Sequence, residues 1–239
     1  MNKRIFLPVF IGLLLLAPMA FALPQEKEPV EKITIIHYKK GFEKSQPPSA
    51  KATPSSCTKY LGKDLKWKTL PINLLINPVN NYGLSEEFVS QAVWNAALEW
   101  DKWTATTLFG SYSIDVSANW DDKVPDNRNE FSFGNYPQNG VIAVTNIWGY
   151  FSGNKKQIVE FDVLFDTDFE WGDATTNKTV MDLQNIATHE IGHGLGLADL
   201  YSTSCYSQTM YGYSTEGETE KRTLDAGDIK GITTLYGAT

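Results

Sequence analysis

The stretch HEIGHGLGLAD, residues 189–199, joins the end of a predicted helix to a glycine bend. Its two histidines, His189 and His193, are four residues apart, so their imidazoles project from one face of a helix and can bind one metal ion. Apolar residues recur at helical spacing through this region and predict a helix that begins near Asp182. Gly196 marks the end of the helix, because glycine readily adopts the conformations that reverse the chain.

The third ligand of such a metal has to come from elsewhere in the chain. A catalytic zinc ion usually has three protein ligands in a tetrahedral arrangement and one open position. The chain contains three histidines, and His37 lies in a polar stretch beside Tyr38 and two lysines, where we expect a surface residue without a metal role. Asp199 follows His193 by six residues, beyond the glycine bend, and offers a carboxylate oxygen instead.

Glu190 is placed to act on whatever the metal binds. It lies about 60° around an ideal helix from His193, so it flanks the metal without having to bind it. A carboxylate in that place can accept a proton from water and pass it to a leaving amine. A His-Glu-x-x-His pentapeptide alone also occurs in ordinary surface helices, and Gly196 and Asp199 at fitting positions are what favour a catalytic zinc site.

These residues resemble the motif of the metzincin superfamily, His-Glu-x-x-His-x-x-Gly-x-x followed by His or, in the snapalysin group, by Asp. From about residue 70 to the C-terminus the chain looks matrixin-like. Residues 209–212, TMYG, resemble the methionine turn beneath the metal, with Met210 as its methionine, and residues 224–237 resemble the closing helix. The resemblance implies a zinc metalloendopeptidase with Glu190 as general base and acid. The implied zinc ligands are His189, His193 and Asp199.

The resemblance also extends to a candidate calcium region. Residues 165–171, FDTDFEW, resemble the matrixin segment that follows the edge strand and helps to bind calcium. Carboxylates suit calcium, so a calcium site is one interpretation and a solvated acidic loop is the other. The candidate calcium ligands are Asp162, Asp166, Asp168 and Glu170. Two family features are missing: the strand around Val144 lacks the histidine of a second, structural zinc, and residues 56–58 do not reproduce the Arg-Cys-Gly latency motif.

The resemblance implies an α+β fold. We expect a metzincin-like catalytic domain with a twisted mixed sheet of four to five strands, an active-site helix, a methionine turn and a C-terminal helix. Apolar runs and alternation predict strands at residues 71–77, 112–120, 141–146 and 158–166. Ser85 caps a further helix, whose apolar stripe continues to Trp103. An extended peptide is expected to pair with the edge strand at residues 141–146.

The N-terminal region has the composition of an exported leader. Basic residues at the start precede an apolar run from Ile5 to Leu16, and a small-x-small pattern ends at Ala22. We expect a signal peptide at residues 1–22, a pro-segment or linker at residues 23–56 and a metalloprotease catalytic domain at residues 57–239. The mature protein is expected to be secreted, extracellular and monomeric, with no membrane attachment.

The distribution of charge excludes one class of partner. The formal charge of the chain is −7, and residues 57–239 carry 13 Lys and Arg against 24 Asp and Glu, or −11. Nucleic-acid binding needs clustered positive charge. We therefore expect protein or peptide substrates and no nucleic acid. The alternative from another class is a zinc-stabilised extracellular binding protein without turnover, although such a site would need no proton carrier at Glu190.

The two cysteines, Cys57 and Cys205, allow two arrangements. In an exported chain they would meet an oxidising environment, where one disulfide persists. Alternatively, one of them could be a latency ligand that fills the open position of the metal. We favour the disulfide because both residues belong to an exported chain.

Overall fold

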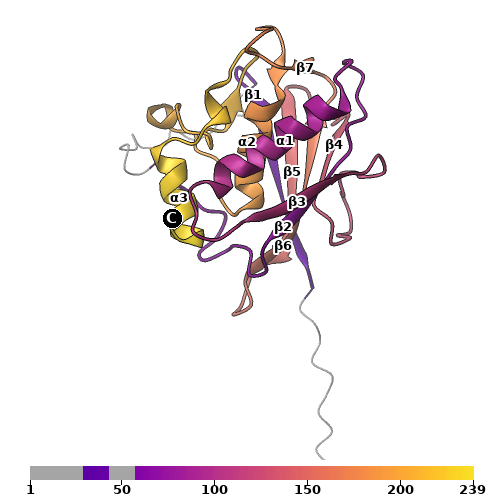
Figure 1. Cartoon of the computed structure of the whole chain (residues 1–239). Helices are drawn as coiled ribbons and strands as arrows, with labels where there is room; N and C mark the ends of the chain where they lie inside the picture. Colours follow the sequence, from indigo (N-terminus) through magenta and orange to yellow (C-terminus); the bar gives the residue numbers. More distant parts are fainter. Residues whose placement is uncertain (1–28, 43–56) are drawn as a thin grey trace, which may run out of the picture.

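The structure is a computed structural model that describes residues 29–42 and 57–239 (Figure 1). The predicted signal peptide at residues 1–22 lies outside the described residues. Within the described ranges, no helix has both the length and the apolar character needed to cross a membrane.

A mixed sheet of seven strands forms the centre of the fold, in the order β3-β2-β4-β6-β5-β1-β9. Strand β2 is parallel to β3 and β4, and β4 is parallel to β6, whereas β5 is antiparallel to both β6 and β1. The strands are β1 Glu31–Lys39, β2 Ile72–Ile76, β3 Phe109–Ile114, β4 Glu130–Gly134, β5 Val141–Tyr150, β6 Gln157–Asp166 and β9 Tyr213–Ser214. The expected mixed α+β architecture is confirmed, with β1, β4 and β9 added to the four predicted strands.

Two helices cover one face of this sheet (Figure 1). Helix α1 spans Glu86–Asp101 and is capped by Ser85, whose Oγ accepts a hydrogen bond from the N–H of Phe88 at 3.1 Å. Helix α2 spans Leu183–Gly194 and packs against α1, β5 and β6. The two helices are also joined by a hydrogen bond from Trp100 Nε1 to the carbonyl of Thr188, at 2.8 Å. Helix α2 is therefore fixed from both sides.

The remaining elements are short and surround α2. A two-stranded sheet comprises β7 Trp171–Gly172 and β8 Met181–Asp182, and 3-10 helices span Thr203–Cys205 (η2) and Glu220–Arg222 (η3). Helix α3, Ala226–Tyr236, closes the domain and begins with a capping box between Asp225 and Asp228. A disulfide joins Cys57 to Cys205, so neither sulfur is a metal ligand in this structure.

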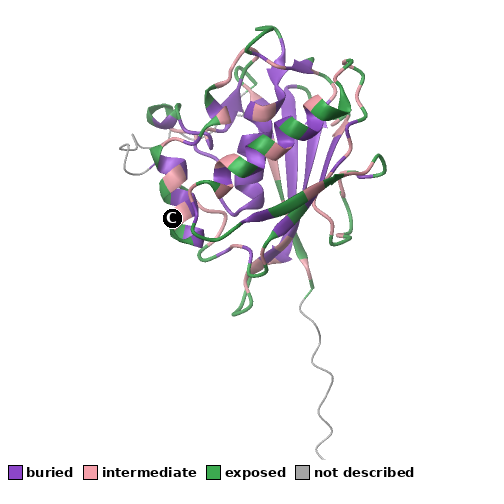
Figure 2. Ribbon diagram, viewed as in Figure 1, coloured by how far each residue is buried: buried purple, intermediate pink, exposed green. Residues whose placement is uncertain are grey.

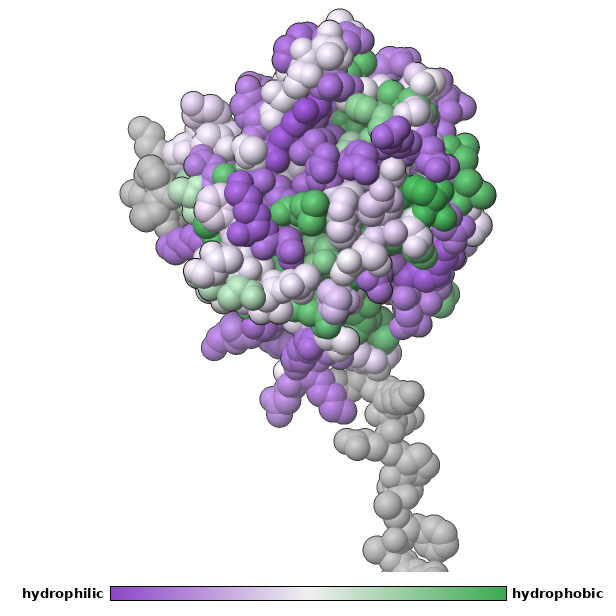
Figure 3. Space-filling view, viewed as in Figure 1, coloured by the Kyte–Doolittle hydropathy of each residue, from purple (hydrophilic) through white to green (hydrophobic). Residues whose placement is uncertain are grey.

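The core lies between the sheet and α1 and α2, where buried residues line the inner faces of both layers (Figure 2). Strand β5 is buried along almost its whole length, since it has hydrogen-bonded neighbours on both sides and α2 above it. Strand β3, at the edge of the sheet, is mostly exposed. On the face that carries α1, hydrophilic side chains predominate and hydrophobic ones form small groups (Figure 3).

Candidate metal centre and active site

The three predicted zinc ligands converge in the structure. His189 Nε2 lies 3.0 Å from His193 Nε2, and Asp199 Oδ1 lies 3.1 Å from the first of these nitrogens and 3.3 Å from the second. Helix α2 supplies both histidines, one turn apart. The chain reverses at Gly196, whose φ of +107° is a conformation that glycine adopts without strain, and this reversal returns Asp199 to the histidine pair.

The arrangement of these atoms fits a tetrahedral zinc ion. Ligand atoms bound at about 2.0–2.1 Å in a tetrahedron lie about 3.3 Å from one another, close to the three observed separations. Asp199 Oδ1 is a buried oxygen without a hydrogen-bond partner among the described residues, which is the state expected of an oxygen reserved for a cation. Two nitrogens and one oxygen are also a donor set that zinc prefers.

Hydrogen bonds select the protonation state that a metal requires. His189 Nδ1 lies 2.7 Å from the carbonyl of Thr209, and His193 Nδ1 lies 2.9 Å from the carbonyl of Leu197. A carbonyl only accepts, so each Nδ1 carries the proton and each Nε2 keeps a lone pair for the metal. Burial lowers the pKa of His189 to about 4, which keeps this imidazole neutral.

Asp199 is held in its ionised form. Burial alone would raise the pKa of its carboxyl group, but the adjacent His193 and His189 outweigh burial and lower the pKa well below its ordinary value. The other oxygen, Oδ2, accepts a hydrogen bond from the hydroxyl of Tyr201 at 2.8 Å. Sequence reasoning did not identify Tyr201, because nothing in the local pattern distinguishes it from other tyrosines of this region.

Met210 lies against helix α2 at Gly192, the residue before His193. A Cβ atom added to Gly192 would be 2.7 Å from Trp100 Cζ2 and closer still to Met210 Sδ, so only glycine lets α2 approach this methionine. Asp228 holds the turn, because its carboxylate accepts from the N–H groups of Thr209 at 2.7 Å and Met210 at 3.1 Å. Helix α3, which carries Asp228, thus holds the turn at Thr209 and Met210 in place.

Glu190 is buried beside the ligands and has two partners. Its Oε2 accepts from the hydroxyl of Thr145, on β5, at 2.5 Å, and its Oε1 lies 2.9 Å from His37 Nδ1. Burial raises the pKa of Glu190 above its ordinary value, so burial favours the protonated form of this carboxyl group. The side chain is thus fixed between strands β5 and β1 and the candidate metal ligands.

Comparison with known protein families agrees with this geometry. The family model described as Matrixin matches residues 66–237, which is most of the chain. The chain belongs to the matrixin family. Matrixins are metalloendopeptidases, and the matched region contains His189, Glu190, His193 and Asp199.

Named relatives match over shorter stretches of this matrixin. The hatching enzyme of Paracentrotus lividus is 30% identical over 155 residues, which cover 56% of this chain and 25% of the relative. Matrix metalloproteinase-16 of Rattus norvegicus and of Homo sapiens are each 34% identical over 76 residues, or 32% of this chain and 12% of the relative. The matched region therefore spans a quarter or less of these proteins.

The expectation that His37 is a surface residue is wrong. It lies on β1 and is fully buried, with its ring centroid 4.0 Å from that of His189. Burial lowers its pKa to about 3, so the imidazole is neutral. The composition around it indicated a solvated linker, but the β-branched run Ile33-Thr34-Ile35-Ile36 is typical of a strand and could have revealed β1.

The candidate calcium ligands of this matrixin are dispersed. Asp162 and Asp166 are buried on β6, whereas Asp168 and Glu170 are exposed in the loop that follows. Among the described residues, the acidic group whose oxygens do converge consists of Asp121, Asp126 and Glu160. Calcium binding by the four predicted residues stays a prediction.

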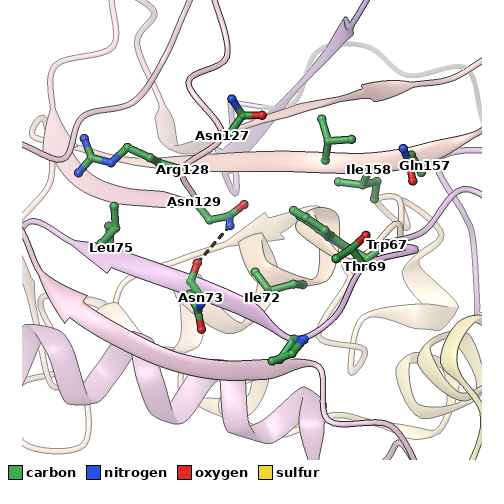
Figure 4. A pocket seen from close by; sticks show the side chains of 12 residues that line it. Trp67, Thr69, Ile72, Asn73, Leu75, Asn127, Arg128, Asn129, Gln157 and Ile158 are labelled. Carbon is green, nitrogen blue, oxygen red and sulfur yellow. Dashed lines mark hydrogen bonds between the residues drawn. The ribbon is translucent and has the colours of Figure 1, made fainter.

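A separate hollow lies away from the metal centre. It has a volume of about 410 Å³ and lies beside β2 and β6, where Asn129 Nδ2 donates to the carbonyl of Asn73 at 3.1 Å (Figure 4). None of the metal-binding residues lines it. This hollow is therefore separate from the junction of α2, β5 and β1, where the candidate metal ligands and Glu190 lie.

Proposed function

We propose that this matrixin is a secreted zinc-dependent endopeptidase that hydrolyses peptide bonds. The observation that carries the proposal is the triangle of His189 Nε2, His193 Nε2 and Asp199 Oδ1, with sides of 3.0–3.3 Å, next to the buried carboxylate of Glu190. Family membership supports the reaction class. The leader-like composition of residues 1–22 supports export, and amino-terminal sequencing of protein from the culture medium, with residue 23 first, would test it.

Each residue of the centre has a defined role in this proposal. His189, His193 and Asp199 would hold the zinc ion, and Tyr201 and two backbone carbonyls would orient them. A zinc ion at such a site acidifies a bound water and polarises a carbonyl group. Glu190 would take a proton from water at Oε1 or Oε2 and deliver it to the departing amine. Thr145 would hold the carboxylate in position through this transfer.

The main chain of β5 supports recognition of extended peptides. It passes directly beside Glu190, through Thr145. The expectation that residues 141–146 form an edge strand is wrong, because β5 pairs with β6 on one side and with β1 on the other. A peptide could pair with the side of β5 that β1 occupies in this structure. A peptide that bound there would place one of its carbonyl groups beside the metal ligands, and longer peptides would gain more main-chain hydrogen bonds than dipeptides.

A peptidase assay tests the proposal. Purified full chain, loaded with one equivalent of zinc, is incubated with a fluorogenic peptide library with and without a chelator. A variant in which β1 cannot pair with β5, Ile35→Pro/Ile36→Pro, is assayed beside it, because proline lacks the N–H that strand pairing requires. We expect chelator-sensitive cleavage that returns when zinc is restored.

A matched pair of carboxylate variants assigns the role of Glu190. Glu190→Ala in the Ile35→Pro/Ile36→Pro background should keep zinc but lose activity by roughly 10²–10⁴-fold. Glu87→Ala, which removes an exposed carboxylate from α1, should leave activity unchanged. If both the unmodified chain and Ile35→Pro/Ile36→Pro bind zinc but cleave no peptide, the result would instead favour a non-catalytic zinc-stabilised binding protein.

A further inference from the structure

A segment of the chain itself occupies the edge where a peptide would bind. Strand β1 pairs antiparallel with β5 from Glu31, opposite Gly149, to Tyr38, opposite Val141. On its other side, β1 is parallel to β9, with Tyr38 opposite Tyr213. The segment therefore fills the groove between β5 and β9 with an extended strand.

Side chains hold this segment in one register. The hydroxyl of Thr34 donates to Asn146 Oδ1 at 2.6 Å near one end, and Lys39 Nζ forms an ion pair with Glu216 at 2.6 Å near the other. Between them, Tyr38 is buried in an apolar cluster formed by β5, β6 and β9. Contacts of both polar and apolar kinds fix where each residue of β1 lies relative to the metal ligands.

This register brings His37 to the catalytic centre. His37 Nδ1 lies 2.9 Å from Glu190 Oε1, and both side chains are fully buried. A carboxylate only accepts hydrogen bonds, so His37 Nδ1 is the donor and its Nε2 carries a lone pair. This is the same tautomer that hydrogen bonds impose on His189 and His193.

The free nitrogen of His37 lacks a partner. Its Nε2 is buried and has no hydrogen-bond partner among the described residues, which is unfavourable for a polar atom. His37, His189 and Glu190 offer ligand atoms that all lie within 4.8 Å of one another. A metal-binding histidine commonly donates its other nitrogen to a carboxylate, as His37 does to Glu190. A cation shared by His37 and His189 would satisfy the buried lone pair of His37.

We propose that residues 31–39 are a built-in inhibitor and that His37 is the fourth protein ligand of the zinc ion. This inference rests on the proposed peptidase function. His37 fills the position that water would need, and it also engages Glu190, the group that would receive the proton. Main-chain pairing of β1 with β5 excludes a peptide from the same edge. The three effects block the metal, the base and the substrate groove together.

Zinc affinity tests the ligand independently of activity. Dissociation constants are measured by competition with a chromogenic chelator for the full chain and for His37→Ala and His37→Phe. The phenylalanine variant keeps a ring against His189 but has no nitrogen. Both variants should bind zinc at least ~10-fold more weakly than the unmodified chain. The control Thr34→Val, which alters β1 away from the metal, should bind zinc within about twofold.

X-ray absorption of the zinc-loaded chain gives a second readout. The unmodified chain should show three imidazole ligands, and both His37 variants should show two. Circular dichroism identifies any variant that does not fold. If His37→Ala does not fold, His37→Phe still provides the test. Equal zinc affinity and equal imidazole count in all chains would overturn the role of His37 as a ligand.

The groove is tested by releasing β1 without changing His37. Ile35→Pro/Ile36→Pro removes the N–H that points to β5, whichever of the two residues supplies it, because successive residues of a strand face opposite edges. The matched control Ile35→Val/Ile36→Val keeps both N–H groups. We expect the proline variant to cleave peptides at least ~10-fold faster than the unmodified chain and the valine control. Equal rates in all three would overturn inhibition by β1.

The two proposals fail in distinguishable ways. If no chain cleaves any peptide, the peptidase function fails, while zinc affinity and imidazole count still decide whether His37 is a ligand. If the unmodified chain cleaves as fast as the proline variant, the peptidase function stands and inhibition by β1 fails.

Discussion

The hydroxyl of Tyr201 donates a hydrogen bond to Asp199 Oδ2 at 2.8 Å and thereby leaves Oδ1 to face His189 and His193. A carboxylate has two equivalent oxygens and can rotate, so a metal ligand of this type needs a partner that fixes it. Tyr201 orients Asp199 by a hydrogen bond, as backbone carbonyls orient the two histidines. Each of the three candidate ligands is thus oriented by a hydrogen bond to its atom that does not face the other two.

Removing this hydroxyl should weaken metal binding. We expect Tyr201→Phe to bind zinc about 10–100-fold more weakly, because partners of metal ligands typically have effects of that size. The measurement is chelator competition at fixed pH. Tyr206→Phe removes the hydroxyl of an exposed tyrosine after η2 and serves as the control. Equal zinc affinity of Tyr201→Phe and the unmodified chain would contradict the orienting role.

Gly192→Ala should destabilise the fold although alanine is the better helix former. Propensity favours alanine by roughly 1 kcal/mol inside a helix. The added Cβ would, however, lie 2.7 Å from Trp100 and closer still to Met210, and overpacking of this kind costs about 1–3 kcal/mol. Urea unfolding should show a lower free energy of unfolding. The control is Gly62→Ala, whose added Cβ would make only ordinary van der Waals contacts and should leave stability unchanged. An unchanged midpoint of urea unfolding for Gly192→Ala would contradict the prediction.

The acidic residues of β6 should make stability depend on pH. Burial raises the pKa of Glu160 to about 7, and burial together with the charge of Glu160 raises that of Asp162 to about 9. Unfolded carboxyl groups titrate near pH 4, so between these values the folded chain binds more protons than the unfolded chain. The free energy of unfolding should therefore fall as the pH rises from 5 to 9.

Asp162→Asn tests this pH dependence. In calcium-free buffer, the loss of stability between pH 5 and pH 9 should be smaller than in the unmodified chain by at least about 1.4 kcal/mol, the equivalent of one pKa unit. Asp168→Asn, which changes an exposed carboxylate of the following loop, should retain the full loss. An identical pH profile for Asp162→Asn and the unmodified chain would refute the assignment.

The Cys57–Cys205 disulfide closes a loop with a sequence separation of 148 residues and joins the start of the described domain to the segment before Met210. Loss of such a cross-link typically lowers the free energy of unfolding by about 2–5 kcal/mol. Cys57→Ser, Cys205→Ser and the double variant should all be destabilised by the same amount in urea. Stability equal to that of the unmodified chain in all three would show that the bond contributes nothing.

The convergence of His189, His193 and Asp199 could be predicted from sequence because these residues follow local rules. Helical spacing brings His189 and His193 together, and a glycine bend of fixed length returns Asp199 to them. Strands β2, β5 and β6 were predicted for the same reason, since their apolar patterns are continuous. The predicted strand at residues 112–120 is displaced relative to β3, and Val116 is exposed.

Features that depend on long-range pairing escaped prediction. Strand β4 is five residues long and ends at Gly134, so it has little pattern of its own and is fixed by its parallel neighbours β2 and β6. His37 is 152 residues from His189, and only the pairing of β1 with β5 brings them together. The lysines and prolines around β1 indicated a linker, and its β-branched residues were outweighed by that composition.

The covalent link between β1 and the domain it covers has a kinetic consequence. A tethered segment keeps the same local concentration at its groove at any protein concentration. Dilution therefore does not activate the protein. A single cut between Lys39 and Cys57 would turn the same contact into an ordinary bimolecular one, which weakens on dilution. Because peptide-bond cleavage is irreversible, each cleaved molecule would then stay active once β1 had dissociated.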